Sequence, residues 1–80
     1  MFDERIKVTA YSGYRGEETP RTFILRDKRI EVVEIQERWV EEGFKDRTRK
    51  MFFEVSGSDG VIHKIYYDEK SMEWYYRFED

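Results

Sequence analysis

The sequence contains no cysteine, one proline and one histidine among its 80 residues. Without cysteine there can be no disulfide to support a small fold and no thiolate ligand for a structural zinc ion. No apolar run approaches the roughly 20 residues that span a membrane, and the charged first residues are unlike a secretory signal peptide. We therefore expect a cytoplasmic protein with no membrane partner.

The chain also lacks an excess of basic charge. Its 15 lysine and arginine residues are outnumbered by 18 acidic residues, which gives a net charge of −3. A general polyanion-binding protein would be strongly basic, so only a local basic patch is compatible with this composition.

Aromatic residues, in contrast, are abundant and make up 18% of the chain. Disordered proteins are poor in aromatic and β-branched residues, so this composition predicts a folded chain. A chain this short buries only roughly 60% of its unfolded surface, and large aromatic side chains compensate by burying the most area each. We expect a single domain over residues 1–80.

Alternating apolar and polar residues predict five short strands. They are expected at about Arg5–Tyr11, Arg21–Arg26, Lys50–Ser56, Val61–Asp68 and Met72–Phe78. In the last of these, the side chains expected to share one face are Met72, Trp74, Tyr76 and Phe78.

The segments between these strands are rich in polar or turn-forming residues. Loops or turns are predicted at Ser12–Pro20, Asp27–Lys28, Glu41–Arg49, Ser56–Gly60 and Asp68–Ser71. The fourth of these consists entirely of serine, glycine and aspartate, all turn-forming residue types, and is the clearest turn in the chain.

One segment, Arg29–Glu42, has two interpretations. Its apolar residues change parity between Val32 and Val33, which a strand accommodates with a bulge or a sharp bend at that point. Helical spacing also fits, with Gly43 as the residue after the helix. Five of its six apolar residues are isoleucine or valine, which favours the strand.

These elements predict an all-β fold: a small, strongly bent antiparallel meander or an SH3-like barrel of five to six strands. Curling into a barrel limits the exposure of strand edges, which a small sheet cannot otherwise hide. The alternative is an α+β fold in which residues 29–42 are helical.

No pattern in the sequence predicts catalysis, a cofactor or a metal. His63 is the only histidine, and spacing alone assigns it no partner, so we interpret it as a structural or surface residue. The acidic residues of the 29–42 segment are interpreted as a solvated face, and Asp59 and Asp68 as turn residues. The glycine-containing segment at residues 12–16 lacks the Lys-Ser/Thr of a phosphate-binding loop. We therefore expect no small-molecule substrate.

Aromatic residues and arginines together mark the candidate binding surface. By alternation, Phe52, Tyr75 and Arg77 are expected to point away from the core. Exposed rings beside guanidinium groups suit single-stranded nucleic acid, whereas cation–π pairs on an ordinary surface give the same pattern. The candidate residues are Tyr11, Tyr14, Arg15, Arg21, Arg26, Arg29, Phe52, Tyr75 and Arg77.

The hydrophobic landmarks also resemble a known family. They are the residues at 19–23, 30–35, 52–55 and 67–68 together with Trp39, Gly60 and Trp74. Over residues 5–78 the chain resembles an uncharacterised family of small bacterial domains, some of which are encoded beside Y-family translesion DNA polymerases. The resemblance implies a bacterial cytoplasmic protein with an accessory role in DNA repair.

Two non-enzymatic functions follow from these observations. The first is a protein-interaction module that pairs an exposed strand edge with another protein or with a second copy as a homodimer. The second is an accessory domain that binds single-stranded nucleic acid. The negative net charge argues more against direct DNA contact than against contact with a protein.

Overall fold

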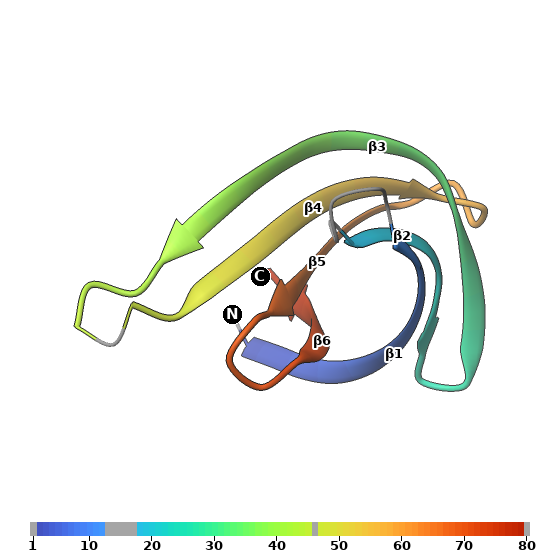
Figure 1. Cartoon of the computed structure of the whole chain (residues 1–80). Coiled ribbons are helices and arrows are strands. Elements are labelled where there is room, and N and C mark those ends of the chain that lie inside the picture. The colour runs from blue at the N-terminus through green and yellow to red at the C-terminus, as the bar shows by residue number, and fades with distance from the viewer. Residues whose placement is uncertain (1, 13–17, 46, 80) are drawn as a thin grey trace.

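Six antiparallel strands form a closed barrel in chain order (Figure 1). A computed structural model describes residues 2–12, 18–45 and 47–79. The strands are β1 Phe2–Ser12, β2 Glu18–Leu25, β3 Lys28–Glu42, β4 Arg49–Gly57, β5 Ile62–Asp68 and β6 Glu73–Phe78. The predicted small all-β barrel is confirmed, and the helical alternative for residues 29–42 is wrong.

Two long strands, β1 and β3, close the barrel because each takes part in two sheets. The first half of β1 pairs with β6, and its second half pairs with β2. The start of β3 pairs with β2, and residues 32–42 pair with β4. β3 therefore arches over the barrel, and the β3–β4 hairpin extends beyond the other strands (Figure 1).

Two bulges allow β3 to bend in this way. Val33 and Gln36 each lack a register partner on β4, so the register shifts between Val32 and Glu34 and again between Ile35 and Glu37. Each extra residue reverses the parity of the strand, so that Val32 and Ile35 both reach the core. The bulge predicted near Val32–Val33 is confirmed, whereas the second, at Gln36, was not predicted.

The barrel interior is filled mainly by large side chains. The core cluster consists of Ile6, Phe23, Ile30, Phe53, Val55, Ile65, Trp74 and Tyr76. They come from all six strands, so every strand contributes to one continuous core, as the aromatic-rich composition predicts.

Several predicted boundaries are wrong by a few residues. β1 begins at Phe2, and the predicted loop at residues 12–20 includes residues that belong to β1 and β2. The first hairpin turns at Arg26–Asp27, one residue earlier than predicted, and both residues have positive φ, as a type I′ turn requires. Met72 has a φ of 59° in the turn before β6 and is 74% exposed, so it does not share the inward face of Trp74.

Candidate functional site

A row of four aromatic rings crosses the outer face of the larger sheet, which consists of residues 32–42 of β3, of β4, β5 and β6, and of the first half of β1. Trp39, Phe52, Tyr66 and Tyr75 occupy directly opposed positions on β3, β4, β5 and β6. Successive ring centroids lie 5.4, 4.6 and 5.2 Å apart, with interplanar angles of 9°, 28° and 19°. We call these four residues the aromatic row.

Cationic side chains lie over the row. The Arg77 guanidinium is 4.8 Å from the ring centroid of Phe52 and 5.3 Å from that of Tyr66. Lys50 and Lys64 lie 5.5 and 5.6 Å from the centroids of Tyr66 and Trp39. The outer face therefore carries a second, smaller packed layer.

Carboxylates neutralise two of these cations. Arg77 donates to both oxygens of Asp3, at 3.1 and 3.2 Å, and the Tyr66 hydroxyl donates to Asp3 Oδ2 at 2.6 Å. The Arg77 hydrogen bond lowers the pKa of Asp3 below its usual 3.8, and the Tyr66 bond adds to it against the opposing effect of burial. Burial and the Asp3 bond raise the pKa of Tyr66. Lys64 in turn forms an ion pair with Glu79.

The prediction for this face is correct in direction and wrong in exposure. Phe52, Tyr75 and Arg77 do point away from the core, but Phe52 is fully buried beneath its neighbours. The reason is that four adjacent strands each contribute a ring at the same level. Phe52 and Tyr66, at 0% and 4% exposure, offer no free ring face for a base.

The smaller sheet of β1, β2 and the start of β3 brings together three other predicted residues. Tyr11 lies on the outer face of β1, and the Arg21 guanidinium is 5.8 Å from its ring centroid. Arg29 lies on the same face, where the opposed row of Lys7, Ile24 and Arg29 crosses the three strands. Lys7 and Ile24 were not predicted.

Of the remaining predicted residues, Arg26 lies away from this surface. Arg26 lies 4.7 Å from the ring centroid of Phe78 and forms an ion pair with Glu4 at 3.5 Å, near the two ends of the chain. Tyr14 and Arg15 lie outside the described residues. The predicted set is thus divided among separate places on the barrel.

His63 is buried, with 4% exposure, and both of its ring nitrogens have partners. Nε2 lies 3.0 and 3.1 Å from the two carboxylate oxygens of Asp59, and Nδ1 lies 2.7 Å from the Tyr76 hydroxyl. A carboxylate can only accept, so Nε2 carries the proton that it donates, and a neutral ring then accepts from Tyr76. His63 is thus a buried residue with two defined hydrogen-bond partners, Asp59 and Tyr76, which its spacing in the sequence did not identify.

The fold positions Asp59 through its turn. The Val61 N–H donates to Asp59 Oδ1 at 3.1 Å, and Ser58 joins the turn to β3 through bonds with the Glu31 backbone. Burial works to raise the Asp59 pKa, but the bonds from His63 and Val61 outweigh it, so the pKa lies below 3.8. Burial, and next the Asp59 charge, raise the pKa of Tyr76, so its hydroxyl keeps the proton that it donates.

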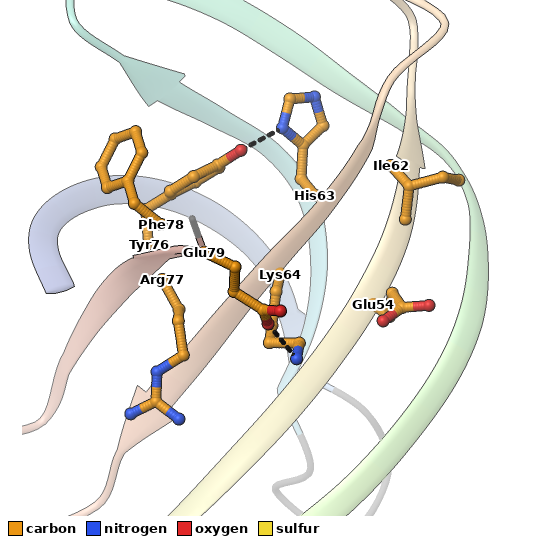
Figure 2. Close-up of a pocket in the computed structure, with 8 residues that line it drawn as sticks. All are labelled: Glu54, Ile62, His63, Lys64, Tyr76, Arg77, Phe78 and Glu79. Carbon is orange, nitrogen blue, oxygen red and sulfur yellow. Dashed lines mark hydrogen bonds and ion pairs between the residues drawn. The ribbon is translucent and has the colours of Figure 1, made fainter. Parts of the chain in front are cut away.

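A shallow depression of about 340 Å³ lies between β5 and β6 beside His63. The register of these strands ends at Ile65 and Tyr76, and the residues beyond line the depression. His63 and Tyr76 project to one side of the two strands, and Lys64 and Arg77 to the other (Figure 2). On the first side the His63–Tyr76 hydrogen bond connects the two strands, and on the second side the Lys64–Glu79 ion pair connects them.

One long strand edge has no strand beside it among the described residues. β3 leaves β2 after Glu31, and from there it pairs only with β4. We call residues 33–42 the open edge. All but Ile35 and Trp39 are exposed, and the acidic residues are Glu34, Glu37, Glu41 and Glu42. The predicted solvated acidic face therefore follows a strand edge, a position that sequence alone did not reveal.

Within the described ranges, no three His, Cys, Asp or Glu side chains lie close enough together to hold a metal ion. The same residues form no helix that could cross a membrane.

A family model described as a domain of unknown function (DUF6504) matches residues 1–76. This match spans all six strands except the end of β6. No curated protein and no solved structure matches the chain.

Proposed function

The chain belongs to the DUF6504 family, and we propose that it is a non-enzymatic protein-interaction module that binds an extended segment of another protein along the open edge of β3. The observation that carries the proposal is the pairing of β3. Of its ten consecutive residues at 33–42, eight pair with β4 on one side, and none has a described strand on the other. An edge of this kind can accept a further strand by main-chain hydrogen bonding.

The segment Glu37–Glu42 is the most suitable part of this edge. It follows the second bulge and pairs with β4 over six consecutive residues without a register shift, so its backbone is regular. Six residues of strand span roughly 20 Å, which is a usual length for a paired strand. Trp39, packed on Phe52, holds the segment in place although it extends beyond the barrel.

The remaining geometry supports a non-enzymatic role. The one buried histidine is held between two partners, and the Tyr76 hydroxyl beside it has a raised pKa, the reverse of what an activated nucleophile requires. Of the cations over the aromatic row, Arg77 and Lys64 form ion pairs with carboxylates. Strand addition requires none of these groups to react.

The experiment is selection from a displayed library of linear ten-residue peptides, followed by hydrogen–deuterium exchange of the intact protein with the enriched peptides. We expect binding to slow amide exchange in residues 33–42, because an added strand protects edge amides. Exchange in β5, which lies between two strands, should not change. Failure to enrich any peptide, or protection confined to another part of the barrel, would overturn the proposal.

A second candidate, single-stranded nucleic acid binding, is supported by the outer face of the smaller sheet. Lys7 and Arg29 form no ion pair with a described residue, and the exposed Tyr11 ring lies on the same face under Arg21. The test is fluorescence anisotropy of a labelled oligothymidine at low and physiological salt. Lys7→Glu/Arg29→Glu should abolish salt-dependent binding, whereas Lys45→Glu/Lys70→Glu, with the same charge change elsewhere, should not. No binding at low salt excludes this candidate.

A further inference from the structure

The side chains beside the open edge restrict what can bind there. Opposed partners on β4 assign Glu37, Trp39 and Glu41 to the outer face, since they face Glu54, Phe52 and Lys50. Arg38 and Val40 lie on the inner face, opposite Phe53 and Met51. Along the regular segment, the outer positions are therefore acidic, aromatic and acidic.

We propose that the partner is an extended segment with basic residues at alternate positions and apolar residues between them; this inference rests on the proposed function. A strand added at this edge places its own alternate side chains beside Glu37, Trp39 and Glu41, at the distance of directly opposed pairs. Lysine or arginine there faces two carboxylates and the indole ring. Its intervening residues lie beside Val40, which is 44% exposed.

The same charges disfavour a second copy of this chain. Two β3 edges paired antiparallel would bring glutamates from both strands together, with only Arg38 available as a cation in each. Like charges opposed across strands destabilise a pair, and charged residues and bulges are the usual protection of an exposed edge. The open edge is thus protected against its own copy and complementary to a basic strand.

Four defined peptides test this inference by calorimetry and hydrogen–deuterium exchange on the whole chain. The first contains Thr-Lys-Val-Arg-Val-Lys between capped glycines, and the second replaces its cations with glutamate. The third has the composition of the first with the three cations adjacent. The fourth is the first peptide N-methylated on alternate residues, which removes strand hydrogen bonds and keeps the charge.

We expect the first peptide to bind and to protect residues 33–42. The glutamate peptide should bind roughly ten- to a hundredfold more weakly at low salt, since two opposed pairs change from attractive to repulsive and the pair with Trp39 loses its cation–π contact. Glu37→Lys/Glu41→Lys should reverse this preference. Glu31→Lys/Glu69→Lys, which changes the net charge equally away from the open edge, should preserve it.

The other outcomes separate the two proposals. If the basic and acidic peptides bind equally and both protect the open edge, the partner chemistry is wrong and strand addition stands. If the adjacent-cation or N-methylated peptide binds as tightly as the first, attraction is purely electrostatic and both proposals fail. If no defined peptide binds while library peptides do, the basic pattern alone is overturned.

Discussion

Gly57, at the end of β4, shows how a single residue can limit the packing of the barrel. A Cβ built there would lie 2.5 Å from Asp59 Oδ1, 2.7 Å from Ile30 Cγ2 and 3.0 Å from His63 Cδ2. We expect Gly57→Ala to destabilise the fold by about 1–3 kcal/mol through overpacking, measured by urea denaturation. Gly60 has a φ of 79° and open space at its Cβ, so a side chain there meets backbone strain but no clash; Gly60→Asn, which tolerates the left-handed region, is the matched control and should destabilise the fold less. Equal stability of Gly57→Ala and wild type would contradict the described packing.

The Asp3 carboxylate should make stability depend on acid pH. Its pKa is lowered in the folded state, chiefly by the hydrogen bond from Arg77, so its contribution is present above the unfolded pKa of about 3.9 and is lost as pH falls through the folded value. The free energy of unfolding should therefore differ between wild type and Asp3→Asn at neutral pH, and the difference should shrink below about pH 4. A difference that stays constant down to about pH 3 would show that folding does not lower the pKa of this carboxyl group.

At the scale of single residues, the sequence identifies residue types but not the side chains that each residue contacts. The absence of cysteine and the presence of a single histidine follow directly from the composition, and alternation along the strand predicted the outward direction of Phe52. The Asp59–His63 contact needs the geometry of the turn at residues 57–61, and the burial of Phe52 needs three rings from other strands. Neither follows from spacing along one chain.

The bulged strand β3 is the element that most constrains the architecture. Val33 has no register partner on β4 and is 69% exposed, so its side chain matters less than its presence in the chain. Deleting Val33 leaves Val32 opposite Gly57 and Glu34 opposite Ser56, so Ile30 and Val32 keep their inward direction, but it removes the bulge at which β3 bends and should destabilise the barrel by straightening the strand. Val33→Thr should stay within about 0.5 kcal/mol of wild type. Thermal denaturation followed by circular dichroism distinguishes the two, and a stable deletion variant would show that the bulge is dispensable.

Apolar periodicity predicted part of the shape of β3. The parity change between Val32 and Val33 revealed the first bulge because apolar residues stand on both sides of it. The second bulge, at Gln36, was hidden because the outward-facing Trp39 has the same parity as the inward-facing Ile35, so the apolar alternation continues across it. The open edge was equally hidden, because pairing partners depend on strand order and on the point at which β3 leaves β2.

For the whole molecule, the acidic open edge predicts the association state. We expect the wild-type chain to sediment as a monomer, because repulsion between glutamates opposes pairing of two open edges. Glu37→Gln/Glu41→Gln should raise self-association measurably in sedimentation equilibrium, most clearly at low salt. A control with Glu31→Gln/Glu69→Gln should remain monomeric. A wild-type dimer that is unaffected by these substitutions would contradict the protective role of the edge.

The pairing of β1 with β6 has a consequence for how the barrel is made. Phe2 opposes Phe78, so the seam that closes the barrel joins β1 to β6, the two strands farthest apart along the barrel sequence. Contacts between such distant parts of a chain form slowly, because a large loop must be ordered first. Until β6 has been synthesised, the first half of β1 has no partner strand on the edge that β6 will occupy. Closure therefore waits until β6 has emerged from the ribosome, and a circular permutant in which β6 is linked directly to β1 would allow this seam to form early.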